Sequence, residues 1–176
     1  DVYKRQEVKM ALRNIRHDQD EILRKQSKLV KVFDDKLKEL ADDMIETMNH
    51  AEGVGLAAVQ VGILKQMIVI DIGEGPMVFV NPDIIETAGS CDDYEGCLSV
   101  PGYSGVVERP EKLKLKYQDL EGKEHELETE GFLTRVICHE TDHLKGILYT
   151  DKAKEMFTND ELKAKLDKEH KMAEAK

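Results

Sequence analysis

The sequence predicts an α+β fold in which antiparallel or mixed β-sheets pack around a central helix. Two helical patterns, over residues 36–52 and 130–145, flank short alternating segments that suit strands and hairpins. The 176 residues are enough for one domain with a core of its own and too few for two.

The first expected element is an amphipathic helix over residues 36–52 in the N-terminal half. Asp34 and Asp35 stand where an N-cap is expected, and Gly53 stands where a helix ends. Apolar residues recur at helical spacing and form one continuous stripe. This stripe consists of Leu37, Leu40, Ala41, Met44, Ile45 and Met48.

The middle of the chain is expected to form strands. "KQMIVIDI" (65–72) and "GPMVFVNP" (75–82) predict two strands around a turn at residues 73–76. Residues 90–105 are rich in Gly, Pro, Ser and Asp, and we expect them to be irregular. "KLKLKYQDLEGKEHELE" (112–128) alternates on both sides of Glu121-Gly122, which is typical of a hairpin.

The last third of the chain predicts two further helices. Thr129 is expected to cap a helix over residues 130–145, and "ILYT" (147–150) is expected to be extended. Residues 159–176 are polar, mix charges of both signs and are expected to be helical.

The composition excludes several classes of protein. A net charge of −10 disfavours non-specific binding to nucleic acid, because it adds repulsion to the phosphate backbone. No apolar run is long enough to cross a bilayer, and the N-terminus has no signal-peptide core, so we expect a cytoplasmic protein. Three cysteines, an odd number, indicate reduced thiols that could bind a metal.

The stretch "CHETDH" (138–143) indicates a metal site. On a helix, His139 and His143 lie on one face with their Cβ atoms about 5–6 Å apart, close enough for both imidazoles to bind one ion. Glu140 is one step round the helix, where it could reach a water without being a ligand. Cys138 points about 100° away from His139, and we interpret it as a small buried thiol.

A catalytic metal site needs a third protein ligand, and the residues alone leave three alternatives. The third histidine of a metzincin would fall on Tyr149, and a neutral phenol is a poor substitute. A metallopeptidase of another type would use a downstream carboxylate, for which Glu155 or Glu161 could serve. The third alternative is Cys97, in a loop bracketed by glycine and proline.

Three stretches together resemble the signature motifs of the peptide deformylase family. They are "GVGLAAVQVG" (53–62), "EGCLSVP" (95–101) and "HETDHL" (139–144), in the family's order. The resemblance extends over about residues 10–150 and implies hydrolysis of the N-formyl group from the initiator methionine of new polypeptides. It divides the chain into an extension (1–9), a catalytic domain (10–152) and a helical tail (153–176).

The resemblance also implies a role for each residue of the site. Glu140 would be the general base and then the acid for the leaving amine. The Gln60 amide and the Leu98 backbone N–H would bind the developing oxyanion. The metal ligands implied are Cys97, His139 and His143, with water in the fourth position.

The substrate-binding residues come from the metal helix and from two glycine-containing stretches. Phe132 and Val136 precede His139 by seven and three residues on one helical face, where they could line a methionine pocket. In the family, the stretch around Val54 and Gly55 and the loop at Gly96 pair with the substrate backbone. Arg135, on the same helix, is expected to point away from the site.

The resemblance implies one divalent metal per chain and N-formylmethionyl nascent peptides as substrates. One cysteine and two histidines by themselves suggest zinc, whereas the resemblance points to Fe²⁺, with Ni, Co or Zn able to occupy the site. We expect a monomer without nucleic-acid or membrane binding, whose C-terminal helix could dock on the ribosome.

Two other functions compete with this interpretation. A metallopeptidase with the same helix motif would bind its metal through Glu155 or Glu161. A non-enzymatic metal-binding protein would keep the fold without turnover. The presence of Glu140, Gln60 and all the implied ligands argues against the second alternative.

Overall fold

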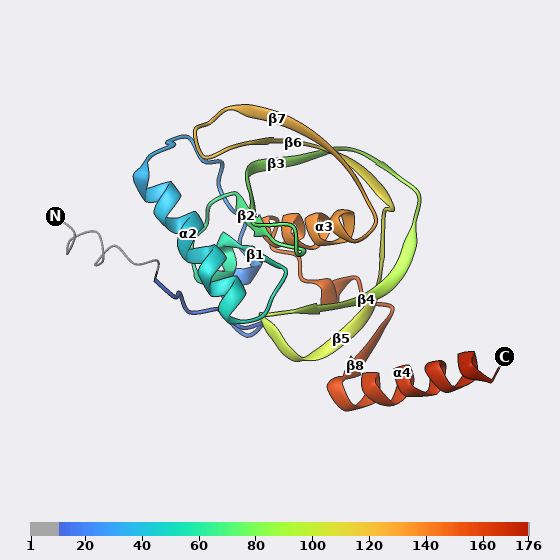
Figure 1. Ribbon diagram of the computed structural model, residues 1–176. Coiled ribbons are helices and arrows are strands. Elements are labelled where there is room, and N and C mark those ends of the chain that lie inside the picture. Colours follow the sequence, from blue (N-terminus) through green and yellow to red (C-terminus); the bar gives the residue numbers. More distant parts are fainter. Residues whose placement is uncertain (1–10, 176) are drawn as a thin grey trace.

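Two antiparallel sheets enclose a central helix, α3 (Phe132–Leu144), in the computed structural model, which describes residues 11–175 (Figure 1). The five-stranded sheet has the order β1-β2-β3-β6-β7, and the three-stranded sheet has the order β4-β5-β8. The strands of the first sheet are β1 (Gly55–Ala57), β2 (Met67–Ile70), β3 (Met77–Ala88), β6 (Lys112–Gln118) and β7 (Glu124–Glu130). Those of the second are β4 (Cys91–Cys97), β5 (Val100–Arg109) and β8 (Glu155–Thr158).

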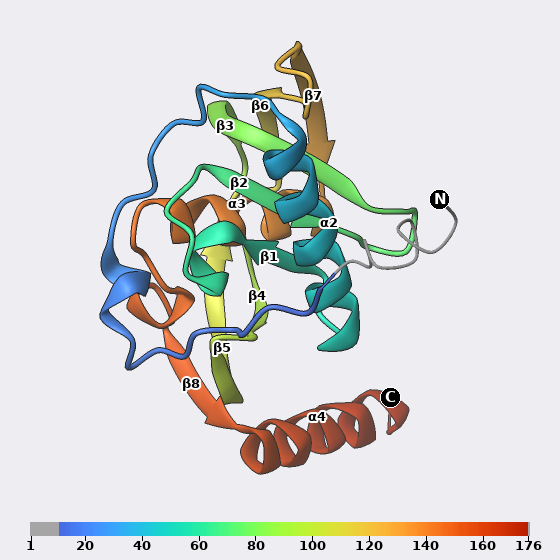
Figure 2. The same cartoon turned by 90° about the vertical axis from the view of Figure 1, so that its left-hand side faces the viewer.

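The predicted α+β fold class is confirmed. The chain also has helices α2 (Asp35–His50) and α4 (Asn159–Glu174) and short 3₁₀ turns η1 (Glu21–Arg24), η2 (Ala58–Val61) and η3 (Tyr149–Asp151). Helix α2 packs beside β1 and β2, as the turned view shows (Figure 2). The predicted extension, residues 1–9, lies outside the described residues.

Helix α2 forms as its pattern predicts. The Asp34 side chain accepts a hydrogen bond from the backbone N–H of Leu37 at 3.0 Å, which satisfies one free donor of the first turn. The predicted stripe faces the interior, where Leu37, Ala41, Met44 and Met48 are fully buried. The helix covers one face of the five-stranded sheet and so fixes the segment that follows it.

Strand β3 is longer than predicted. Its expected end was Pro82, yet it continues to Ala88. Pro82 falls in a register shift between Val80 and Asp83, where a residue without a backbone N–H breaks no regular pair. Asn81, just before it, has a positive φ of 51° that accommodates this bulge.

The expectation that residues 90–105 are irregular is wrong, because they belong to the hairpin of β4 and β5. Side chains that point inward from these strands include Glu95 and Arg109, which are 7% and 3% exposed. Hydropathy therefore gives no alternating pattern here, since charged residues occupy buried positions. Strand β8, which pairs with β5, was not predicted either.

Two expectations near α3 are also wrong. The N-cap is Gly131, at φ 72°, whereas Thr129 belongs to β7 and shares a hydrogen bond of 2.7 Å with the Thr134 hydroxyl. The stretch "ILYT" was expected to be extended, but its second half enters the 3₁₀ turn η3. The Asp151 carboxylate accepts the backbone N–H of Leu148 and so closes this turn.

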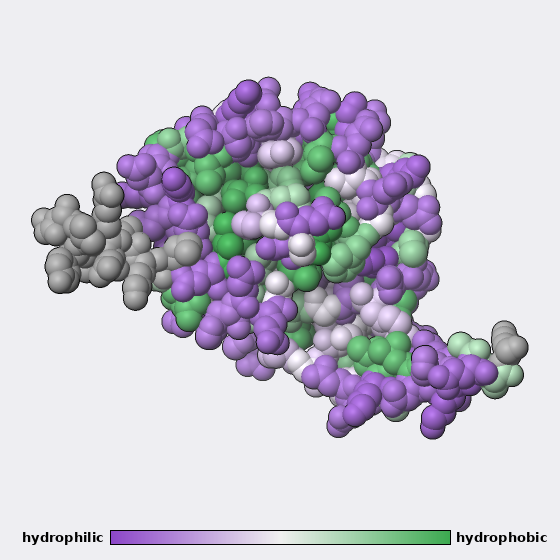
Figure 3. Space-filling view, viewed as in Figure 1, coloured by the Kyte–Doolittle hydropathy of each residue, from purple (hydrophilic) through white to green (hydrophobic). Residues whose placement is uncertain are grey.

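Helix α4 confirms the predicted C-terminal helix and protrudes from the body of the molecule (Figures 1 and 2). Its surface is mostly hydrophilic in the space-filling view, with an apolar patch between it and the body (Figure 3).

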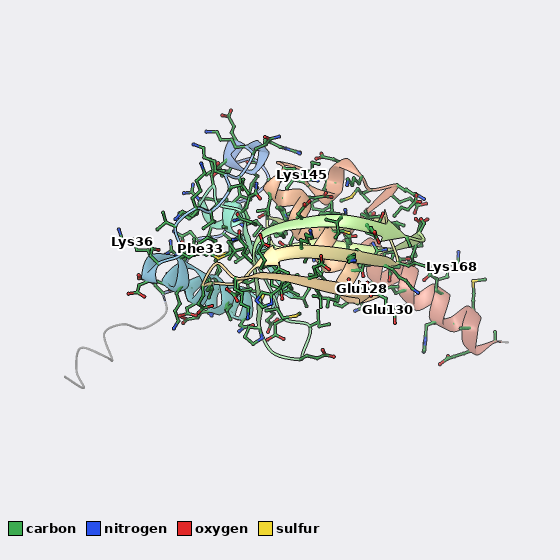
Figure 4. All side chains as sticks on the ribbon, turned by 90° about the horizontal axis from the view of Figure 1, so that it is seen from above. Phe33, Lys36, Glu128, Glu130, Lys145 and Lys168 are labelled. Carbon is green, nitrogen blue, oxygen red and sulfur yellow. The ribbon has the colours of Figure 1, made fainter. Side chains whose placement is uncertain are left out.

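Charged residues such as Glu128 and Glu130 line the edge strand β7 (Figure 4), which discourages pairing with another chain. Among the described residues, no helix combines the length and apolar character required to span a bilayer.

Candidate metal centre

Three side chains from two elements converge at one point inside the molecule. Cys97 ends β4, and His139 and His143 lie one turn apart on α3. One potential ligand atom from each residue lies within 4.8 Å of the others. The Cys97 Sγ is 3.4 Å from the His143 Nε2. A thiolate and two imidazoles at this spacing form a donor set for one transition-metal ion.

A buried carboxylate oxygen without a partner fits a cation at this point. Within residues 11–175, Glu140 Oε2 is buried without a hydrogen-bond partner, and so is His143 Nδ1, the ring nitrogen that does not face Cys97 Sγ. Burial lowers the pKa of His143 well below its usual value, so the imidazole keeps the lone pair that a metal ligand needs. Burial also raises the pKa of Glu140 to about 7.

The Glu95 carboxylate fixes the orientation of His139. Glu95 Oε1 lies 2.8 Å from His139 Nδ1, which leaves His139 Nε2 to face Cys97 and His143. Arg109 donates to both oxygens of the same carboxylate, at 2.9 and 3.0 Å. Burial alone would raise the pKa of Glu95, but hydrogen bonds from His139 and Arg109 outweigh it and lower the pKa to about 2.

Arg135 also belongs to this buried network, which corrects the expectation that it points away from the site. Its Nη1 donates to Glu95 Oε2 at 2.6 Å and to the Val107 carbonyl at 2.8 Å. Asp142 accepts a hydrogen bond from Arg109 at 2.6 Å and is also paired with Lys152. A single sequence gives no indication of these pairs, because the partners are distant along the chain.

Gln60 points into the site and is not a surface residue. It is 1% exposed, and its Nε2 donates to Ser99 Oγ at 3.0 Å and lies 3.6 Å from Cys97 Sγ. Its Oε1 accepts the backbone N–H of Ala57 at 2.9 Å, which assigns the amide orientation. The amide hydrogens therefore face the thiolate side of the centre.

A cavity of about 410 Å³ opens beside these groups. Its lining includes every predicted substrate-binding residue, namely Val54, Gly55, Gly96, Phe132 and Val136, as well as Leu98. Val136 is buried, whereas Phe132 is 56% exposed at the rim. A Cβ at position 55 would lie 2.8 Å from Glu140 Oε1, so any larger residue there would displace the Glu140 side chain. Sequence reasoning missed Glu52, Tyr94 and Glu95 in this lining.

The carboxylates required by the metallopeptidase alternative lie elsewhere. Glu155 is exposed on β8, and Glu161 completes the capping box that Thr158 begins at the N-terminus of α4. In the part of the chain that the structure describes, the cluster of potential ligands contains neither of them. Cys138 is buried, its pKa is raised to about 11 by burial, and it is not part of the cluster.

Comparison with known proteins assigns the family. The family model for polypeptide deformylase matches residues 12–159. The chain belongs to the polypeptide deformylase family. Members of this family are metal-dependent hydrolases. The peptide deformylase of Caldicellulosiruptor bescii is 53% identical over 163 residues, which cover 93% of this chain and 98% of that protein. That of Alkaliphilus metalliredigens is 56% identical over 143 residues, with 81% and 97% covered.

Solved structures agree with this assignment. The crystal structure of peptide deformylase from Thermotoga maritima has a TM-score of 0.81 at 44% identity and covers 82% of this chain and 99% of its own. A peptide deformylase from Synechococcus elongatus in complex with actinonin has a TM-score of 0.80 at 42% identity, with 91% and 86% covered. The fold is therefore that of the family.

The buried network predicts a large stability loss when Glu95 is neutralised. Glu95→Gln should lower the free energy of unfolding by about 3 kcal/mol or more, because two buried guanidinium groups lose their counter-charge. The measurement is urea unfolding of the metal-free protein. Glu108→Gln is the matched control, since Glu108 is on the same hairpin but its side chain is 54% exposed, and it should hardly change stability. Equal losses in the two variants would contradict this account.

Proposed function

We propose that this chain removes the N-formyl group from N-formylmethionyl polypeptides at one divalent cation held by Cys97, His139 and His143. The observation that carries the proposal is the position of Glu140. This residue follows His139 on α3, lines the same cavity as Cys97 and His139, and keeps one buried oxygen without a partner among the described residues. A base, a ligand set and a substrate cavity therefore meet at one place.

The donor set suits a transition metal, and the identity of the ion is part of the proposal. When bound, the cation would polarise a water molecule and make a nucleophile available at neutral pH. One cysteine and two histidines by themselves favour zinc. The resemblance to the family favours Fe²⁺, and we propose Fe²⁺ as the cellular ion, with Ni, Co or Zn as substitutes.

Glu140 moves the proton during hydrolysis. Its pKa of about 7 lets the carboxylate accept a proton from the attacking water and give it up again at neutral pH. The water oxygen forms a bond to the formyl carbon, and the bond between that carbon and the methionine nitrogen breaks. Glu140 then delivers its proton to the leaving amine, and formate is released.

Gln60 and Leu98 stabilise the negative charge that develops on the formyl oxygen. The Gln60 amide lies near Cys97, and Leu98 lines the cavity beside it. Such a donor, removed alone, typically costs about 3–4 kcal/mol of transition-state stabilisation. Both donors are held in place before substrate binds, Gln60 by Ala57 and Ser99 and Leu98 by the β4–β5 turn.

The cavity suits a formylated methionine. Val136 and Phe132 offer an apolar surface beside the centre, while Val54, Gly55 and Gly96 lie where an extended backbone can approach. A thiolate ligand donates more charge than an imidazole and so tempers the Lewis acidity of the cation. An unhindered formyl group tolerates this better than an ordinary peptide bond, which favours a deformylase over a peptidase.

The ligand assignment predicts a selective loss of metal. Cys97→Ser should weaken metal binding by more than the roughly 10–100-fold that the loss of an outer-shell partner costs. Cys138→Ser is the control and should bind the metal normally, because Cys138 lies outside the cluster. The measurement is metal content after dialysis against a chelator. Unchanged metal in Cys97→Ser would instead support ligands such as Glu155 or Glu161.

The role of Glu140 predicts loss of turnover without loss of metal. Glu140→Ala should reduce formate release from formyl-Met-Ala-Ser by about 10²–10⁴-fold, because the proton acceptor and donor is removed. Glu128→Ala, on the exposed edge strand β7 (Figure 4), is the control and should keep full activity. Metal analysis of the same samples completes the test. Substantial activity in Glu140→Ala would contradict the assigned role.

We also propose that residues 10–152 form the catalytic domain and that the tail, residues 153–176, contacts the ribosome while the enzyme acts as a monomer. Helix α4 buries none of its residues, and Leu166 and Met172 are 43% and 60% exposed. A chain truncated after Thr158 should bind ribosomes more weakly in co-sedimentation. Unchanged ribosome affinity after truncation would contradict the docking proposal.

Light scattering of the intact chain should give the mass of one chain, because we expect the enzyme to act as a monomer.

A further inference from the structure

Among residues 11–175, the wall of the substrate cavity contains a strand, β4, that has a neighbouring strand on one side only. Strand β4 is an outer strand of its sheet, and its partner β5 occupies only one side. The last part of β4, from Tyr94 to Cys97, lines the cavity together with Glu52, Gly53, Val54 and Gly55. An edge strand is held by one ladder of backbone hydrogen bonds, here with β5, so side-chain contacts add to what keeps it in position.

Tyr94 supplies such contacts, and they lead to the C-terminal helix. Its ring packs edge-on against Phe157 of β8, with ring centroids 6.2 Å apart. Lys165 of α4 places its Nζ 5.8 Å from the centre of the Tyr94 ring and 4.7 Å from that of Phe157. The Tyr94 hydroxyl lies 3.4 Å from Glu169 Oε1, also on α4. Two residues one turn apart on α4 therefore contact the same tyrosine.

These contacts lie on the opposite side of β4 from the metal centre. Side chains alternate along a strand, so Tyr94 and Glu95 point to opposite faces. Glu95 points toward α3 and His139, and Tyr94 points toward α4. The strand is thus held from inside by the Glu95 network and from outside by α4. The inner network is buried, whereas the outer contacts lie on the surface and hold the strand more weakly.

We propose that Tyr94 is a positioning residue through which α4 fixes the free edge of β4 and strengthens binding of the peptide residues that follow formylmethionine. The inference rests on the proposed function. The first residue of the substrate occupies the apolar cavity beside α3. The residues after it run along the β4 edge, so their binding depends on how well that edge is held in place.

The test compares a long and a short substrate in the metal-loaded full chain. Lys165→Ala should raise KM for formyl-Met-Ala-Ser by about 2–5-fold, the range expected when a cation is removed from an aromatic face at the surface. The kcat for this tripeptide, both parameters for formyl-Met alone, and the metal content should stay within about twofold, because the centre itself is untouched.

Three further variants separate positioning from general structural damage. Lys165→Arg should restore the KM, because a guanidinium also packs on aromatic rings. Lys168→Ala should match the wild type, since Lys168 is on the same helix (Figure 4) but makes no hydrogen bond or ion pair within residues 11–175. In a Tyr94→Ala background, Lys165→Ala should add no further effect if the helix acts through that ring.

Two outcomes would overturn the inference while leaving the proposed function intact. One is an active wild type whose KM for the tripeptide does not change in Lys165→Ala. The other is an equal rise in KM for formyl-Met and for the tripeptide, which would place the effect at the centre. A wild type that releases no formate from either substrate would overturn the proposed function, and this inference with it.

Discussion

The buried carboxylate of Glu95 joins the parts of the molecule that form the candidate metal centre. Its two oxygens accept hydrogen bonds from Arg109 on β5, from Arg135 on α3 and from His139 itself. Cys97 stands two residues further along the same strand, so the carboxylate that orients a histidine also sets the distance of the thiolate from it. Moving these elements apart would leave buried charges without partners, which is costly. Strand β4, its hairpin partner β5 and helix α3 are therefore held together as one unit.

The two buried carboxylates of this region have different pKa values because their partners differ. Glu95 has cationic partners that outweigh burial, so its pKa falls to about 2 and it stays ionised. Glu140 has no such hydrogen-bonded partner among the described residues, and burial raises its pKa to about 7. In the proposed mechanism Glu95 is a fixed charge and Glu140 is the proton carrier, and the two lie on the neighbouring elements β4 and α3. The close approach of Gly55 to Glu140 completes this arrangement, since it leaves no room for another side chain.

The sequence was most informative where regular periodicity and burial coincide. The apolar stripe of α2, the β6–β7 hairpin and the spacing of His139 and His143 each follow from a period of 3.6 or 2. The third ligand could not be chosen by periodicity, because Cys97, Glu155 and Glu161 were equally compatible with the helix motif. The glycine and proline that bracket Cys97, and the resemblance of "EGCLSVP" to a family motif, favoured Cys97. Its convergence with the histidines is visible in the structure alone.

The missed features depend on contacts between distant residues. The β4–β5 hairpin was not predicted because Glu95 and Arg109 are buried as a charged pair, which hydropathy assigns to the surface. Arg135 was misplaced for the same reason, since its partner lies 40 residues away. The link from α4 to Tyr94 is likewise absent from any local pattern, because 75 residues separate Tyr94 from Glu169. Local sequence patterns predict single helices and strands. The packing of these elements against one another depends on contacts between charged and aromatic side chains that are distant along the chain.

The most direct test of the central claim is a metal titration of the metal-free wild-type protein under anaerobic conditions, with formate release from formyl-Met-Ala-Ser measured at each point. The account predicts that activity rises in proportion to bound Fe²⁺ and levels off at one ion per chain. Full occupancy at one ion per chain without formate release would contradict it and would favour a peptidase or a metal-binding protein without turnover.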